Sequence, residues 1–306
     1  NGADLIVTSV PGVAESTRSR ADGDGIIVFT FPPSKEALQP PGYAFCPVTT
    51  YNDDQAYTAL KWIAENHPDF PQDRPARIGG AAWNEPYMHT ALEGAQAYCD
   101  ENPDKYEWAG KYITDFSFTW DTEVDALKDC DYIIPPQIMN SFVDQYTAEG
   151  YSTTFVGIEA QMAFLNLIDK YDLWQSIDGM ILFRTTPWWT DECADTVFAK
   201  QLLMEYHPEK ADSIIGSGSG YLSVFPHRVV FAIIEEAIAA GGGDNFDSEL
   251  LYETAQSFSF DIGGALHTYT ETKRTSANYV RAYQVDAARK NVYQAGPNWY
   301  PISRLP

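Results

Sequence analysis

The chain has 306 residues, enough for about two domains, and its apolar and aromatic content suffices for packed cores. With 43 acidic and 20 basic residues it carries a formal net charge of −23, which excludes a basic surface for nucleic acids or anionic membranes. No apolar run reaches the roughly 18 residues of a membrane span. No secretory signal is present and the first residue is Asn, so we expect a processed mature chain or part of one.

Apolar segments of strand length alternate with segments of helical periodicity, which is typical of βαβ units and a mostly parallel sheet. The strands are short and almost continuously apolar, so we expect a sheet that is covered on both faces. The predicted strands span residues 3–10, 25–31, 43–50, 76–82, 107–116, 131–137, 153–158 and 179–186. The predicted helices span residues 53–67, 87–101, 121–129, 139–149, 193–206, 226–240 and 248–256.

Segments rich in proline and polar residues indicate where the chain passes between lobes. Residues 68–75, FPQDRPAR, are predicted to form one such crossing, and residues 184–192, RTTPWWTDE, a second. The glycine-rich segments 216–221 and 241–245 are typical of loops. These signals predict an α/β protein of two lobes.

The four cysteines and five histidines show no arrangement typical of a metal site. The cysteines are widely spaced without a CxxC pair, and the histidines are scattered. We therefore expect neither a metal ion nor a cofactor. We also expect a disulfide between Cys99 and Cys130, because both fall near the ends of elements that flank the sheet of the second lobe.

Six segments in chain order carry a resemblance to a known family: NGADLIV, GDGIIVFTFPPSKEAL, GYAFCPVTTYNDDQAYTALKWIAE, RIGGAAWNEPYMHTALEGAQ, DYIIPPQIMNSFVDQYTAEGYSTTFVGIEA and GYLSVFPHRVVFAIIEEAIAAGGG. Their order resembles that of the type I periplasmic solute-binding proteins of ABC transporters, especially the branched-chain amino-acid branch. The resemblance implies two α/β lobes joined by crossing strands, which close on a small molecule and pass it to a membrane permease without catalysis.

The resemblance also implies a division of the chain. Residues 1–70 and about 190–245 are expected in the first lobe, residues 71–189 and about 246–275 in the second, and residues 276–306 near the hinge. The family begins with a strand, a helix and a strand ahead of the position that matches Asn1, roughly 60 residues by the size of a βαβ unit. We expect that this segment was cut away or lies in another chain. We expect a monomer in the periplasm or outside the cell, and a lipid anchor remains open.

Glu159 is the first candidate ligand-binding residue, because it follows the strand 153–158 where α/β proteins place ligands. The resemblance implies that its carboxylate receives the ammonium of the ligand. The alternative is a helix N-cap or an acid in the first turn of a helix, which the helix dipole stabilises whatever binds nearby.

Two loops that precede helix-like stretches are candidates for binding a carboxylate through backbone N–H groups and hydroxyls. Ser34 matches a family position that binds the ligand head group, and its alternative role is a helix cap. Pro32 lies in the same loop. Gly12 and Val13 stand where the family usually has a serine, so a backbone contact alone is expected there.

The remaining candidates are aromatic or amide side chains. Tyr87 matches a tyrosine that closes over the ligand from the second lobe, with Trp83 on the same strand end, and ordinary packing is the alternative for both. Gln137 offers a donor and an acceptor. Trp188 is expected either as an aromatic wall or as a hinge contact, and Tyr221 at the border of the cleft.

The expected ligand is a small amino acid or a related aromatic or organic carboxylate. So many aromatic residues around a cleft favour a ligand larger than leucine or an aromatic one. The first alternative function is a ligand-sensing receptor domain of the same fold. The second is an enzyme, which the absence of a GxSxG, P-loop or GxGxxG motif opening a helix disfavours.

Overall fold

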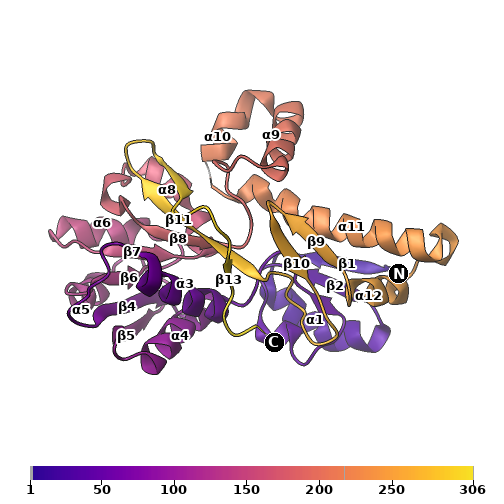
Figure 1. The fold of residues 1–306 in the computed structure, drawn as a ribbon, viewed down its shortest axis with the longest axis horizontal. Helices are drawn as coiled ribbons and strands as arrows, with labels where there is room; N and C mark the ends of the chain where they lie inside the picture. The colour runs from indigo at the N-terminus through magenta and orange to yellow at the C-terminus, as the bar shows by residue number, and fades with distance from the viewer. Residues whose placement is uncertain (1–2, 217, 306) are drawn as a thin grey trace.

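The first lobe is built on a small parallel sheet. In the computed structural model, which describes residues 3–216 and 218–305, three strands pair in the order β1-β2-β3, with Leu5 opposite Ile27. An antiparallel hairpin, β9 and β10, lies beside this sheet (Figure 1). The strands are β1 (Leu5–Thr8), β2 (Ile27–Thr30), β3 (Ala44–Phe45), β9 (Ser259–Ile262) and β10 (Ala265–Thr268). The helices of this lobe are α1 (Pro11–Asp24), α2 (Lys35–Leu38), α11 (Val224–Gly241) and α12 (Ser248–Ala255).

The second lobe contains a larger sheet with the strand order β12-β11-β8-β7-β6-β4-β5, and β13 pairs with β11. The neighbouring strands β8-β7-β6-β4-β5 are parallel to one another. Strands β11, β12 and β13 are antiparallel additions at the β8 side of the sheet. The parallel strands are β4 (Ala76–Trp83), β5 (Tyr106–Thr114), β6 (Tyr132–Ile134), β7 (Thr154–Gly157) and β8 (Ile181–Arg184). The others are β11 (Tyr279–Asp286), β12 (Asn291–Gln294) and β13 (Tyr300–Pro301).

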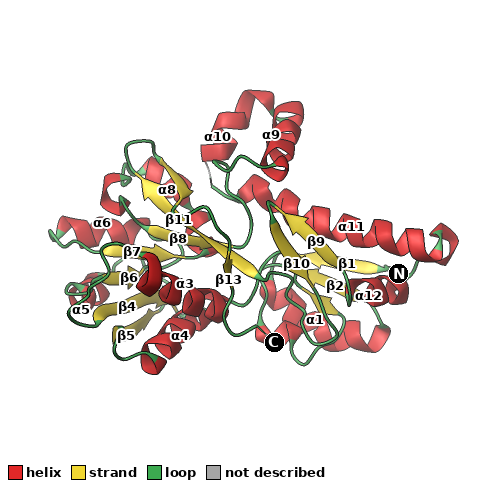
Figure 2. Ribbon diagram, viewed as in Figure 1, coloured by secondary structure: helices red, strands yellow, loops and turns green. Residues whose placement is uncertain are grey.

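Helices cover both faces of the large sheet, as Figure 2 shows. Along β6 the side chain of Ile133 belongs to one hydrophobic cluster, and those of Tyr132 and Ile134 belong to another. This alternation confirms the prediction of a sheet buried on both sides. The helices of this lobe are α3 (Asn52–Asn66), α4 (Pro86–Glu101), α5 (Asp121–Leu127), α6 (Asn140–Ala148), α7 (Glu159–Met162) and α8 (Leu165–Lys170). Two more helices, α9 (Ala194–Tyr206) and α10 (Ala211–Gly216), stand above the junction of the lobes in Figure 1.

The predicted first crossing at residues 68–75 is wrong, because the chain changes lobes earlier. Helix α3 already packs in the second lobe, where Ala59 and Leu60 are completely buried in the same cluster as Ile78 of β4. The crossing is the segment after β3, which begins with a bridge between Cys46 and Thr275. The first part of the first lobe therefore ends near residue 50 instead of residue 70.

The two late segments also lie differently from the expected division. Residues 246–275 pack on the first lobe: Ile27 N donates to Ser248 Oγ at 2.8 Å, and Tyr43 Oη donates to Glu249 Oε2 at 2.7 Å. Residues 279–294 belong to the sheet of the second lobe, since Ala282 is the register partner of Phe183. Sequence periodicity predicted the helix at residues 248–256, but it predicted none of the strands β9 to β13 and did not show which sheet this part of the chain would join.

The four cysteines are free thiols, so the predicted Cys99–Cys130 disulfide is wrong. Cys99 on α4 packs in the cluster with Ile78, whereas Cys130 packs in the cluster on the opposite face of the large sheet. Two cysteines separated by a sheet cannot bring their Cβ atoms within the roughly 4 Å that a disulfide needs.

Helices α3 and α4 cross at a glycine. A Cβ atom on Gly94 would lie 2.1 Å from the backbone oxygen of Asp53, much closer than real Cβ contacts. Since backbone atoms cannot rotate away, a side chain here would force the two helices apart. This close crossing holds the start of α3 against the second lobe.

We predict that Gly94→Val lowers the midpoint of thermal unfolding, with a destabilisation of about 1–3 kcal/mol that is typical of overpacking. Gly23→Ala in α1 is the control, because a Cβ at Gly23 would meet no atom within 4 Å. That variant should be neutral or slightly stabilising. Equal midpoints for Gly94→Val and the wild type would contradict the account of the helix crossing.

His267 is a residue of β10 and contacts the segment that leads from β10 towards β11 in the second lobe. It is almost completely buried, and its Nδ1 lies 3.1 Å from Ser276 Oγ. Burial, with a smaller contribution from Lys273, lowers the pKa of His267 to about 3 from an ordinary value near 6.5. The ring therefore stays neutral in the folded protein at pH values where it is charged in the unfolded chain.

We predict that acid destabilises the protein partly through His267. As the pH falls below about 6.5, His267 takes up a proton in the unfolded state but not in the folded state. The free energy of unfolding therefore decreases towards pH 3. The melting temperature of the wild type should fall more between pH 7 and pH 4 than that of His267→Gln. The exposed His227, substituted in the same way, should leave the acid response unchanged. Parallel melting curves for the wild type and His267→Gln would refute this assignment.

Candidate ligand-binding site

Two adjoining cavities lie where the lobes meet, and both contain Glu85 and Tyr87 in their walls. The first has a volume of about 700 Å³ and is called the acidic cavity here. The second has a volume of about 590 Å³ and is called the Glu159 cavity. Because residues from both lobes line each of them, closing the lobes would change the shape of both.

The carboxylate of Glu159 is held at the end of the large sheet. Strand β7 ends at Gly157, and Glu159 is the first residue of α7. Its Oε1 accepts hydrogen bonds from Thr185 N at 2.9 Å and from Thr185 Oγ1 at 2.6 Å. No described residue donates a hydrogen bond to Oε2, so one oxygen of a fixed carboxylate is left for a donor in the cavity.

Glu159 is an acid in the first turn of α7, as the alternative interpretation expected, but its side chain does not cap that helix. The backbone N–H of Ile158 donates a hydrogen bond to Gln161 Oε1 at 2.9 Å, and this contact fixes the turn between β7 and α7. The Glu159 side chain turns instead to the neighbouring strand end. At Gly157 a Cβ would lie 2.8 Å from Leu182 Cδ2, so a glycine allows the end of β7 to pack closely against β8.

Tyr87 lines both cavities, and hydrogen bonds of its backbone atoms hold it in place. Its N–H donates to Glu85 Oε2 at 2.8 Å, and its carbonyl oxygen accepts from Asn52 Nδ2 at 3.0 Å. Burial, followed by the charges of Glu159 and Glu85, raises the pKa of Tyr87. The phenol therefore remains protonated.

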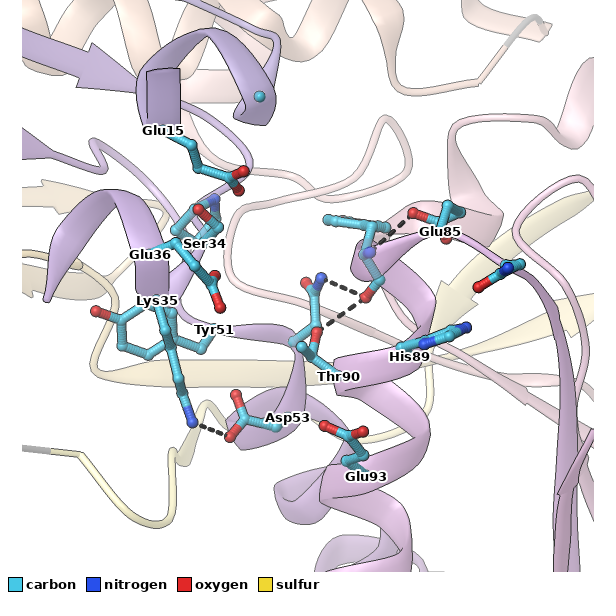
Figure 3. Close-up of a pocket in the computed structure, with 15 residues that line it drawn as sticks. Glu15, Ser34, Lys35, Glu36, Tyr51, Asp53, Glu85, His89, Thr90 and Glu93 are labelled. Atoms are coloured by element: carbon cyan, nitrogen blue, oxygen red, sulfur yellow. Dashed lines mark hydrogen bonds and ion pairs between the residues drawn. The ribbon is translucent and has the colours of Figure 1, made fainter. Parts of the chain in front are cut away.

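The acidic cavity has carboxylates on both sides. Figure 3 shows Glu15 and Glu36 on the first lobe, and Glu93 with His89 on α4 across the opening. Lys35 is ion-paired with Asp53 at the start of α3, so the cation is already matched to one carboxylate. An excess of negative charge favours a cationic or neutral group of a ligand in this cavity and disfavours an anionic one.

Ser34 and Gly12 lie in the acidic cavity, apart from Glu159. Ser34 Oγ accepts a hydrogen bond from Ala37 N at 3.2 Å, so the hydroxyl caps α2 as the alternative interpretation expected. Val13 is exposed on α1 and lines neither cavity. The two residues predicted to bind opposite charges of one head group, Ser34 and Glu159, are therefore in different cavities.

Pro32 and Gln137 lie in the wall of the Glu159 cavity, on opposite lobes. Their placement agrees with the sequence expectation of a cleft between the lobes. Their contact with a ligand remains a prediction.

Three predicted residues lie outside both cavities. Trp83 is buried in the core of the second lobe beside Trp120, and its Nε1 donates to Ser117 O at 2.7 Å. Trp188 is also buried, with Nε1 bonded to Asn291 Oδ1 at 3.0 Å. Tyr221 packs against His207, although its neighbours line the Glu159 cavity. In each case the indole or phenol ring faces packed side chains, so Trp83, Trp188 and Tyr221 are corrected to structural positions in this conformation.

Sequence reasoning missed Arg184, which lines the Glu159 cavity as the last residue of β8. The signal that selected Glu159, a polar residue where a buried strand ends, applies equally to Arg184 in the segment GMILFRTT. It also missed Asp53, which is buried yet lines the acidic cavity. Among the described residues, no group of three or more His, Cys, Asp or Glu side chains could hold a metal ion.

Comparison with known structures shows the fold. The chain is similar to a branched-chain amino-acid ABC transporter protein from Thermus thermophilus with bound valine, with a TM-score of 0.77, 12% identity, and coverage of 98% of this chain and 78% of that chain. It is similar to a leucine-binding protein from Thermotoga maritima, with a TM-score of 0.74, 12% identity, and coverage of 96% and 79%. A solute-binding protein from Rhodopseudomonas palustris in complex with 3,4-dihydroxybenzoic acid gives a TM-score of 0.74, 12% identity, and coverage of 98% and 79%.

These structural neighbours are substrate-binding proteins of ABC transporters, and they match nearly the whole of this chain. The predicted two-lobed α/β fold of the type I periplasmic binding proteins is confirmed. No protein-family model and no curated protein matches the sequence. In the described part of the chain, no helix combines the length and the apolar character needed to cross a membrane.

Proposed function

We propose that the protein captures a small amino acid or a related organic carboxylate between its lobes, outside the cytoplasm, and delivers it to an ABC transporter permease. The observation that carries this proposal is the Glu159 carboxylate, which Thr185 holds at the edge of a cavity that both lobes line. Valine and 3,4-dihydroxybenzoic acid, which two of the similar proteins bind, are both small carboxylic acids.

The connections between the lobes support a mechanism of capture by closure. The chain passes between the lobes after β3, after β8 and before β11, and Cys46 N donates to Arg274 O at 2.8 Å where two of these segments run together. A few paired segments of this kind allow two rigid lobes to rotate while each sheet stays intact. Closure would then exclude water from the ligand and strengthen its polar contacts.

Binding and release, without chemistry, account for the groups in the Glu159 cavity. Glu159 is hydrogen-bonded to a threonine hydroxyl and a backbone N–H, and no described nucleophile with an adjacent base lies beside it. A fixed carboxylate with one unpartnered oxygen suits an ammonium group, since charge-assisted hydrogen bonds are the stronger ones.

The experiment is a calorimetric screen of amino acids, amino-acid amides, aromatic acids and urea-like compounds. We predict binding at one site per chain, and a loss of about 2–4 kcal/mol for an amino acid after Glu159→Gln. That corresponds to roughly 30- to 1,000-fold weaker binding. The glutamine keeps an acceptor oxygen for Thr185 and removes only the charge, so the fold should be retained.

Glu235→Gln on the exposed face of α11 is the matched control and should bind as the wild type does. If Glu159→Gln binds amino acids as tightly as the wild type, the role given to Glu159 is wrong. Chemical conversion of any ligand during the screen would contradict the transport proposal and support an enzyme.

A further inference from the structure

Arg184 is a buried cation without an anionic partner at the wall of the Glu159 cavity. The residue is 5% exposed, and no carboxylate of a described residue forms an ion pair with it within 4.0 Å. Burying a charge without a counter-charge is costly, and proteins normally pair such groups. An unpaired buried cation beside a cavity therefore points to an anionic group of a ligand.

The guanidinium of Arg184 is oriented and only partly used. Its Nε donates to Thr186 O at 3.2 Å, and its Nη2 donates to Thr186 Oγ1 at 2.8 Å. The ring of Trp188 lies 5.3 Å from Cζ and packs against the guanidinium. No described residue accepts a hydrogen bond from Nη1, so donor capacity remains for a planar acceptor such as a carboxylate.

The neighbouring arginine shows what a paired cation looks like here. Arg281 is the register partner of Arg184 on β11, and it forms an ion pair with Asp191 at 3.3 Å. The remaining capacity of Asp191 is taken by Tyr283 Oη at 2.6 Å and Gln294 Nε2 at 2.9 Å. Of the two facing arginines, Arg281 is neutralised inside the protein and Arg184 is not.

Glu159 and Arg184 stand side by side on adjacent strand ends. Gly157 is the register partner of Leu182, and both charged residues come two positions later. They line one cavity and still form no ion pair with each other, because Glu159 is bonded to Thr185 and Arg184 to Thr186. A carboxylate and a guanidinium held apart in this way leave room for a group that carries both opposite charges.

We infer that Arg184 binds the carboxylate of the ligand while Glu159 binds its ammonium, so that the second lobe reads both charges of an α-amino acid. This inference rests on the proposed function and names the substrate class of the same site. It moves carboxylate recognition from Ser34, which lies in the acidic cavity, to the end of β8. The side chain of the amino acid then extends towards the acidic cavity or the first lobe.

The test uses matched ligand pairs, the twenty standard L-amino acids and their C-terminal amides, measured by calorimetry on the whole chain. The amide keeps the ammonium and the side chain and removes the negative charge. The wild type should bind at least one amino acid about 30-fold or more tightly than its amide, the loss expected when one partner of a buried charged pair is removed. Arg184→Gln should lose this preference, and Arg184→Lys should keep part of it.

Arg77→Gln on β4 is the matched control, because Arg77 forms an ion pair with Glu107 and lines neither cavity. It should preserve the preference for the acid. The melting temperature of ligand-free Arg184→Gln should not fall, since the substitution removes an unpaired buried charge. A fall in melting temperature together with equal weakening of acid and amide would show a structural role and overturn the inference.

The outcomes separate the two proposals. If the wild type binds acids and amides alike, or if Arg184→Gln keeps the preference for the acid, the assignment to Arg184 is wrong and the solute-binding function stands. If the wild type binds neither amino acids nor their amides, the proposed amino-acid function and this inference both fail.

Discussion

The parallel pairing of β6, β7 and β8 determines where the polar chemistry of this protein lies. Parallel strands end at the same edge of a sheet, and here that edge faces the other lobe. Glu159 and Arg184 reach the same cavity for this reason alone, although 24 residues of other structure separate them along the chain. The hydrogen bonds from Thr185 to Glu159 then tie the two strand ends together.

The crossing segments connect this edge to the first lobe. The bridge between Cys46 and Thr275 joins two of them, and Ser276 N donates to Cys46 O at 3.1 Å. The buried His267 contacts Ser276 at the same place. The hinge is thus a small paired structure built from distant parts of the sequence, and the cavities lie beside it. Any rotation of the lobes about these segments would therefore change the shape of the cavities.

The acidic cavity adds a second constraint on the ligand. Its carboxylates come from α1, α2, α3 and α4, so the negative charge surrounds the opening on both lobes. In the Glu159 cavity, by contrast, the guanidinium of Arg184 shares the wall with the carboxylates of Glu159 and Glu85. A ligand with its carboxylate near Arg184 and a neutral or positive remainder is therefore favoured by the charges of both cavities.

Local sequence patterns predicted where helices and strands lie along the chain better than they predicted which elements pack together. The periodicity of residues 53–67 predicted α3 within a residue or two, but gave no sign that the helix packs on α4 rather than in the first lobe. The strand-end rule selected Glu159 correctly as a cavity residue and also selected Trp83, whose side chain points into the core. Alternation along a strand decides between these outcomes, and the last residue of a strand can face either way.

The relation between Ser34 and Glu159 was beyond the sequence for a physical reason. Each lies at the start of a helix, but on different lobes, and their separation depends on the hinge. Arg184 shares the strand-end position that selected Glu159 but belongs to no motif, and its burial without a counter-charge is what distinguishes it. That property exists in the folded structure alone.

Small-angle X-ray scattering of the protein with and without a saturating amino acid tests the central claim most directly. If the lobes close around a ligand held by Glu159 and Arg184, the radius of gyration should decrease on binding. The decrease should be smaller for Glu159→Gln at the lowest amino-acid concentration that saturates the wild type. An unchanged radius of gyration in the wild type at full occupancy would contradict capture by lobe closure.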